Sequence, residues 1–140
     1  MEIKLKRLNN AVHFKASNKD GNSIEFDGSP EIGGEGKGMR PMEVLLSSVA
    51  GCSVFDIVSI LKKQRENLMD ISITATGDRK SQGDVKPFTS IHLRFDFKGD
   101  LTESKVARAV ELSVEKYCSV ASSLDPNINI THSYTINSES

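Results

Sequence analysis

The sequence predicts a single α+β domain spanning residues 1–140, with its elements in the order βββ, helix, ββ, helix, β. Three observations lead to this prediction: short alternating segments in the first third, one long apolar run without proline, and two further alternating segments around a second helical pattern. A chain of 140 residues can bury well over half of the surface that it exposes when unfolded, so no second domain is needed.

The first third of the chain predicts a three-stranded antiparallel meander. Its alternating segments begin at Ile3, continue at 12–16 and 24–26, and are separated by polar turns. The glycine-rich residues 28–38 have no apolar periodicity, which predicts an irregular loop that could move.

A long helix is predicted from Pro41, because proline suits the first helical turn, where its missing N–H costs nothing. Of the 18 residues from Val44 to Leu61, 12 are apolar and surround the helix axis, which is typical of a helix buried on nearly all sides. Serines and Asp56 interrupt the run, which favours a protein core over a membrane span. One chain of this size has difficulty enclosing such a helix, so we expect a homodimer.

In the second half of the chain, apolar residues recur first at the spacing of a strand, then at the spacing of a helix, and then again at the spacing of a strand. The expected elements are paired hairpin strands at 71–75 and 91–97, a helix capped by Thr102 or Ser104 that runs to Tyr117 with Cys118 near its end, and a last strand at 128–136.

The charge distribution and the N-terminal sequence indicate which partners and which cellular compartment to expect. The 18 basic and 19 acidic residues are spread along the whole chain and leave a net charge of -1, so no nucleic-acid partner is expected. The N-terminal residues alternate apolar and charged side chains where a secretory signal would need an unbroken apolar stretch. We therefore expect a cytoplasmic protein that does not associate with a membrane.

The two cysteines are the strongest candidates for chemistry. Cys52 lies in the middle of the long helix and Cys118 at the end of the second, so packing could bring them to the Cα separation of about 4.4–6.8 Å that a disulfide needs. They form no CxxC motif, and the histidines have no metal-ligand spacing, so neither a metal nor a bound cofactor is expected. Each cysteine could instead be a buried structural residue.

A reactive Cys52 needs a positive charge or hydrogen-bond donors to favour its thiolate. Arg40 is the best nearby source, and Glu43 on the first helical turn could hold its guanidinium in an ion pair. A solvated arginine and an ordinary first-turn acid are the alternative. His92 or His132 could also reach Cys52 in space, although no local signature supports a Cys–His hydrolase.

Several segments resemble the OsmC/Ohr family, and they cover nearly the whole chain. Each is short, but their combination is specific and most resembles an uncharacterised bacterial OsmC-like branch. The segments are Arg40–Leu46 (RPMEVLL), Ala50–Ser53 (AGCS), Val106–Val110 (VARAV), Glu115–Val120 (EKYCSV) and Ile130–Tyr134 (ITHSY).

The resemblance implies an intertwined homodimer with the two long helices at its centre, and a thiol-dependent peroxidase that protects against oxidative stress. It assigns Cys52 to attack on an organic hydroperoxide, which leaves a sulfenic acid, and Cys118 to resolution of that acid as a disulfide. It also implies a dithiol or lipoyl-protein reductant.

The chain departs from the family pattern at the start of the helix. The characterised peroxidases have a glutamate directly after the helix-opening proline, paired with an arginine from the N-terminal strand region. Here Met42 takes that place, Glu43 points about 100° around the helix, and the turn at 9–10 carries asparagines with Arg7 before it. Arg40 and Glu43 could replace the pair; alternatively, the protein binds a small hydrophobic ligand in the dimer cleft without catalysis.

Overall fold

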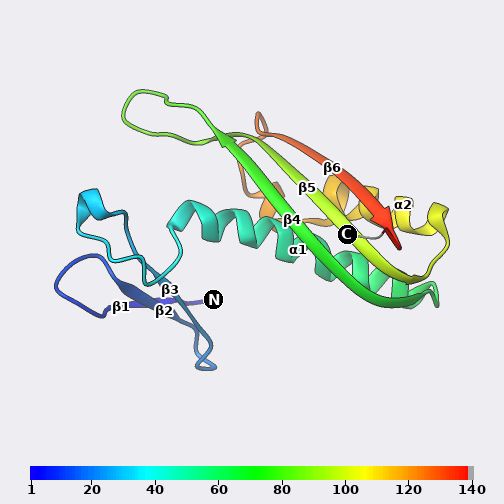
Figure 1. Cartoon of the computed structure of the whole chain (residues 1–140), viewed down its shortest axis with the longest axis horizontal. Helices are drawn as coiled ribbons and strands as arrows, with labels where there is room; N and C mark the ends of the chain where they lie inside the picture. The colour runs from blue at the N-terminus through cyan, green and yellow to red at the C-terminus, as the bar shows by residue number, and fades with distance from the viewer. Residues whose placement is uncertain (139–140) are drawn as a thin grey trace. The chain divides into compact units, whose positions relative to one another are not determined.

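The computed structural model describes residues 1–138, which form two compact units, one from Met1 to Leu45 and one from Leu46 onward. Along the chain, three short strands precede a long helix, and two long strands, a second helical segment and a last strand follow (Figure 1). This order confirms the predicted α+β class. The extent of a single domain over residues 1–140 stays a prediction.

The first unit contains the predicted meander, an antiparallel sheet in the order β1-β2-β3. Its strands are β1 (Lys4–Arg7), β2 (Phe14–Ser17) and β3 (Ser23–Phe26). Leu5 and Ile24 both pair with Ala16. Because alternate side chains of a strand point to the same face, this register gathers apolar side chains on one face of the sheet.

The glycine-rich loop after β3 is tied to one carboxylate. Asp27, only 2% exposed, accepts the main-chain N–H groups of Gly28, Glu35 and Lys37 at 2.7, 3.2 and 3.0 Å. These hydrogen bonds hold the pKa of Asp27 below its ordinary value, and the bond from Lys37 has the largest effect. The loop also contains a short 3-10 helix, η1 (Pro30–Ile32). The segment predicted to be irregular is therefore anchored at several points along its length.

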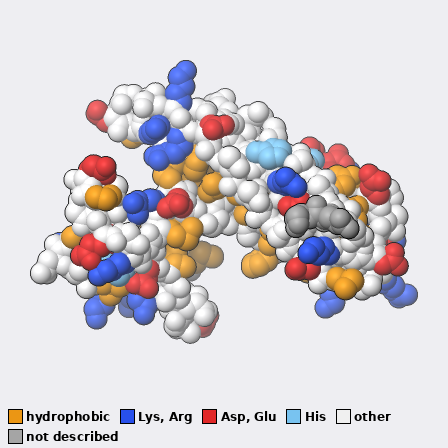
Figure 2. Space-filling view, viewed as in Figure 1, with side chains coloured by type: hydrophobic (Ala, Val, Ile, Leu, Met, Phe, Trp, Pro, Cys, Tyr) orange, Lys and Arg blue, Asp and Glu red, His pale blue; other side chains and the backbone are white. Residues whose placement is uncertain are grey.

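The long helix α1 (Pro41–Lys63) begins at the predicted proline. Within one chain it buries a single stripe at a spacing of four residues, and other apolar side chains, such as Phe55 at 77%, are exposed. Figure 2 shows apolar side chains at the surface where Figure 1 draws the middle of α1. By length and composition α1 also qualifies as a membrane span, a test that core helices of globular proteins pass as well. The buried stripe is Val49, Ser53, Ile57 and Leu61.

The second unit is built on a sheet in the order β4-β5-β6. β4 (Asn67–Arg79) and β5 (Phe88–Asp100) form the predicted antiparallel hairpin, and β6 (Asn129–Ile136) pairs in parallel with β5. Both hairpin strands are longer than predicted, because main-chain pairing continues through residues whose side chains follow no apolar alternation. At Gly99, φ is 145° and a Cβ would collide with the carbonyl oxygen of Asn67, so only glycine fits this irregular end of the hairpin.

One face of this sheet is buried. Ile91, Leu93, Phe95 and Phe97 alternate along β5 and are at most 1% exposed. In Figure 1, α1 and α2 lie behind the three strands. These side chains therefore form much of the apolar core of the second unit.

The second helix is interrupted before Cys118. α2 (Glu103–Leu112) begins after Thr102, but the Thr102 hydroxyl does not cap it as predicted; it donates to Glu66 at 3.1 Å. The expected continuous helix to Tyr117 is likewise wrong. After α2 the chain adopts a π-helical turn, η2 (Ser113–Tyr117), and a short helix, α3 (Ser119–Ser122), follows Cys118.

Candidate functional site

The structure brings together the two cysteines, which are far apart in sequence. Cys52 lies on α1 and is partly exposed, whereas Cys118 is 3% exposed. The Cys118 thiol points at α1, where it lies 4.0 Å from the main-chain carbonyl oxygen of Val49, and it interacts with the Cys52 side chain. Both thiols are free. One cysteine is therefore partly exposed while its neighbour is enclosed.

The surroundings of Cys118 disfavour its thiolate. Burial raises the pKa of the Cys118 thiol above its ordinary value, and the adjoining Cys52 side chain raises it further. The main-chain N–H of Ala121 donates to the Cys118 sulfur at 3.3 Å and opposes this shift in part, as does the Ser53 side chain. These surroundings therefore favour the protonated form of the Cys118 thiol.

The π-helical turn places Cys118 against α1. The main-chain N–H of Cys118 donates to the carbonyl of Ser113, five residues earlier, at 3.1 Å. At the other end of the turn, the buried Ser113 hydroxyl donates to the carbonyl of Ser53 at 2.7 Å. π-helical turns inside helices are rare and occur frequently at functional sites. Here the turn fixes Cys118 relative to the residue that follows Cys52.

Arg40 and Glu43 belong to the first unit, and both cysteines belong to the second. The Glu43 carboxylate accepts the main-chain N–H of Arg40 at 2.8 Å, as the acid of a capping box does. Arg7 donates from Nε to the Ala11 carbonyl at 2.8 Å and from Nη2 to the Asn10 carbonyl at 2.6 Å, so it closes the β1–β2 turn. Support of Cys52 by Arg40 and Glu43 stays a prediction.

The histidines have partners other than the cysteines. His92 contacts the hydroxyls of Thr131 and Ser133 at 2.7 and 2.9 Å, both on the neighbouring strand β6. His132 lies 3.8 Å from a carboxylate oxygen of Glu115. Within residues 1–138 neither histidine is hydrogen-bonded to a cysteine, which gives no support to a Cys–His hydrolase.

The sequence reasoning missed Asp56, which lies one helical turn after Cys52 on the same side of α1. Its Oδ2 atom is buried and has no hydrogen-bond partner within the described chain. The i, i+4 spacing of Cys52 and Asp56 is the sequence signal that could have identified it.

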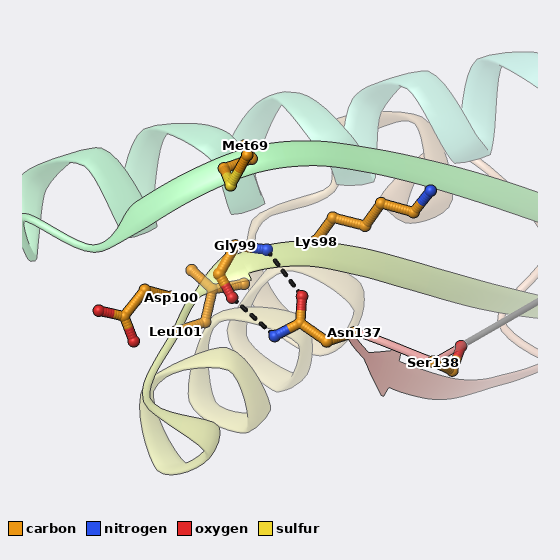
Figure 3. A pocket seen from close by; sticks show the side chains of 7 residues that line it. All are labelled: Met69, Lys98, Gly99, Asp100, Leu101, Asn137 and Ser138. Carbon is orange, nitrogen blue, oxygen red and sulfur yellow. Dashed lines mark hydrogen bonds between the residues drawn. The ribbon is translucent and has the colours of Figure 1, made fainter.

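Another hollow of the second unit is lined by no cysteine. It lies at the end of the sheet, has a volume of about 990 Å³, and is lined by residues such as Met69, Lys98 and Leu101. Figure 3 shows that the Asn137 side chain accepts the main-chain N–H of Gly99 and donates to its carbonyl, and these bonds measure 3.0 and 2.8 Å. Residues 1–138 contain no group of three or more His, Cys, Asp and Glu side chains that could hold a metal ion. The cysteine pair is therefore the candidate site.

The chain is similar to known proteins along most of its length. The family model described as OsmC-like protein matches residues 34–133. Protein YhfA of Escherichia coli strain K12 is 43% identical over 124 residues, 88% of this chain and 89% of its own. A crystal structure of a hypothetical protein from Aquifex aeolicus VF5 is 33% identical with a TM-score of 0.78, covering 98% of this chain and 97% of that one.

A more distant structure shares the fold. It is the organic hydroperoxide resistance protein OsmC from Legionella pneumophila, 20% identical with a TM-score of 0.66, and it covers 96% of this chain and 97% of that one.

Proposed function

Because this chain belongs to the OsmC-like protein family, we propose that it is a thiol-dependent peroxidase that reduces organic hydroperoxides. Cys52 is the nucleophile and Cys118 the resolving thiol. The observation that carries the proposal is the interaction between the partly exposed Cys52 on α1 and the enclosed Cys118, which directly follows the π-helical turn η2. A fold shared with a protein named for organic hydroperoxide resistance supports the choice of substrate.

The proposed chemistry proceeds in two steps. The Cys52 thiolate attacks the terminal oxygen of the hydroperoxide, the O–O bond breaks, and an alcohol leaves, so Cys52 becomes a sulfenic acid. The Cys118 sulfur then attacks the Cys52 sulfur, water leaves, and a disulfide forms. The proton that Cys118 loses in the second step leaves with the water, and the raised pKa of Cys118 disfavours its own attack on the peroxide.

The proposal also covers the assembly of the protein, its cellular compartment and its reductant. The exposed apolar side chains of α1, Phe55 and Val58 among them, support a homodimer in which two copies bury these helices against each other. Such an interface would also offer an apolar path for an organic hydroperoxide. We propose a cytoplasmic protein that a dithiol or a lipoyl-protein reductant returns to the reduced state.

Two single-cysteine variants test the proposal. Cys52→Ser is expected to abolish turnover of cumene hydroperoxide, whereas Cys118→Ser is expected to consume one equivalent and then stall as a sulfenic acid. Dimedone labelling followed by mass spectrometry detects that acid on Cys52. A Cys52→Ser protein that keeps its full activity contradicts the proposal.

The contacts of Arg7 favour a second candidate function, the binding of a small hydrophobic ligand without catalysis. The Arg7 guanidinium is engaged by carbonyls of its own turn, and Met42 stands where family peroxidases have a glutamate. A weakened activating pair suits a protein whose cysteines only line a cleft. Native mass spectrometry of purified protein tests this function, and preparations that repeatedly contain no bound small molecule count against it.

A further inference from the structure

His92 joins β5 to β6 through both nitrogens of its ring. Its Nδ1 atom lies 2.7 Å from the Thr131 hydroxyl, and its Nε2 atom lies 2.9 Å from the Ser133 hydroxyl. The two strands run in parallel, and His92 stands opposite Thr131 in their register. Thr131 and Ser133 are exposed, and His92 is partly exposed. The three side chains therefore form a hydrogen-bonded row at the surface of the second unit.

This row lies on the polar face of the sheet. Along β5, the buried residues Ile91 and Leu93 alternate with His92 and Arg94. Successive side chains of a strand point to opposite faces, so His92 and Arg94 share the face away from the buried residues. Ser133 pairs with Arg94 in the register and reaches His92 on that face. A small molecule can therefore approach Ser133 from solvent.

The two hydrogen bonds of the ring have opposite directions. A neutral imidazole has one N–H donor and one acceptor nitrogen, so one hydroxyl accepts from the ring and the other donates to it. When the proton is on Nδ1, the Thr131 hydroxyl accepts and the Ser133 hydroxyl donates to Nε2. A serine that donates to a base, which a third group orients in turn, is the arrangement of an activated nucleophile. Ser133 suits this role better than Thr131, because a primary alcohol is the less hindered nucleophile.

We propose that Ser133 is a nucleophile for acyl transfer, with His92 as its general base and Thr131 as the positioning residue that orients the ring. The substrate class is a small activated ester, because the open face of the sheet is accessible to a small molecule and encloses no large one. The inference goes beyond the proposed peroxidase function, since neither cysteine takes part in it.

The acyl transfer balances as an addition followed by an elimination. The Ser133 Oγ atom bonds to the carbonyl carbon of the ester, while His92 Nε2 takes the hydroxyl proton. The carbonyl oxygen becomes an oxyanion, and its electron pair then re-forms the double bond as the bond to the leaving alcohol breaks. His92 gives its proton to that alcohol, and the acyl group remains on Ser133 as an ester.

Arg94 provides a positive charge beside the reacting serine. It is the register partner of Ser133, and its Nε atom donates to Asp96 at 3.2 Å. Asp96 also accepts from the Thr135 hydroxyl at 2.6 Å, so the carboxylate that holds Arg94 is itself bound to β6. A cation held in place near a developing oxyanion stabilises the transition state of acyl transfer. Arg94 is therefore the residue that we expect to stabilise the oxyanion.

A fluorophosphonate probe tests the nucleophile in the full-length protein. An activated serine attacks the phosphorus of the probe, fluoride leaves, and a stable phosphonyl ester remains on the serine. Peptide mapping by mass spectrometry is expected to find the probe on Ser133. Ser72 is the internal control, because it is exposed on β4 opposite Asp96 and contacts no histidine within residues 1–138. Absence of label, label on Thr131, or equal label on Ser72 and Ser133 overturns the inference.

Two exposed threonines provide a matched pair of variants. Thr131 and Thr76 both stand opposite His92, on β6 and β4, but in the described part of the chain only Thr131 is bonded to the ring. His92→Gln should slow labelling of Ser133 by about 100-fold and Thr131→Val by about tenfold, because the first removes the base and the second only its orientation. Thr131→Ser should restore the rate, and Thr76→Val should match the natural protein. Equal labelling rates in the natural protein, His92→Gln and Thr131→Val overturn the inference.

Discussion

The Ser113 hydroxyl donates a hydrogen bond of 2.7 Å to the main-chain carbonyl of Ser53, the residue that follows Cys52. Both serines are fully buried. The bond joins the start of the π-helical turn that leads to Cys118 with the helix that carries Cys52. It therefore links the two chain segments that carry the cysteines.

Loss of the hydrogen bond from Ser113 to Ser53 should affect both the stability of the fold and the formation of the disulfide. Ser113→Ala is expected to lower the free energy of unfolding by about 1 kcal/mol, the usual net value of one buried hydrogen bond. It should also slow formation of the Cys52–Cys118 disulfide. Urea denaturation and the rate of thiol loss measure the two effects. Ser123→Ala is the control, because its exposed hydroxyl also donates to a carbonyl, that of Ser119 at 2.9 Å; an equal effect of both variants would contradict the account.

The raised pKa of Cys118 predicts a shifted pH profile. In a Cys52→Ser variant, alkylation of Cys118 by iodoacetamide should reach half its maximal rate above the pH of about 8.5 that is typical of a free cysteine. Since the folded state favours the protonated thiol, the stabilisation is present below the ordinary pKa and is lost as the pH rises through the raised one. A midpoint at or below that of free cysteine would show that burial does not control this thiol.

The contacts of Glu66 predict that the folded state becomes less stable in acid. Its carboxylate accepts from Lys105 at 2.9 Å and from the Thr102 N–H at 2.7 Å, and these bonds lower the pKa of Glu66. A lowered pKa stabilises the folded state above the ordinary value of about 4.3, and this is lost as the pH falls through the lowered value. Glu66→Gln should therefore lower the Tm at pH 7 and make little difference at pH 3.

A matched variant checks the assignment of this pH dependence. Glu111 pairs with Arg108 at 3.3 Å, but its side chain is about half exposed, so Glu111→Gln should change the Tm little at either pH. If the two variants behave alike, the contacts of Glu66 are not the cause.

The exposed side chain of Phe55 predicts that the homodimer forms through the apolar face of α1. Light scattering should give the mass of a homodimer for the natural protein and of a monomer for Phe55→Glu, because a carboxylate is costly to bury in an apolar interface. Val85, 63% exposed between β4 and β5, provides the control, since Val85→Glu should leave the dimer intact. A natural protein that remains monomeric would remove the explanation for the exposed face of α1.

Periodicity predicted the helices and strands whose side chains separate into buried and exposed faces. β5 is the clearest case, since Ile91 to Phe97 alternate in sequence and in burial. The turn at Ser113–Tyr117 was not predictable in this way, because its change of hydrogen-bond pattern leaves the apolar spacing of Val110 and Val114 intact. The contact of Cys52 with Cys118 depends on the docking of two helices, and a pattern along one chain segment carries no information about docking.

The measurement that tests the central claim most directly is a stopped-flow titration of the reduced protein with cumene hydroperoxide, counting free thiols before and after one equivalent. The account predicts that both Cys52 and Cys118 lose their thiols together, much faster than free cysteine reacts. Loss of thiols no faster than that of free cysteine would contradict it and leave ligand binding as the function of this fold.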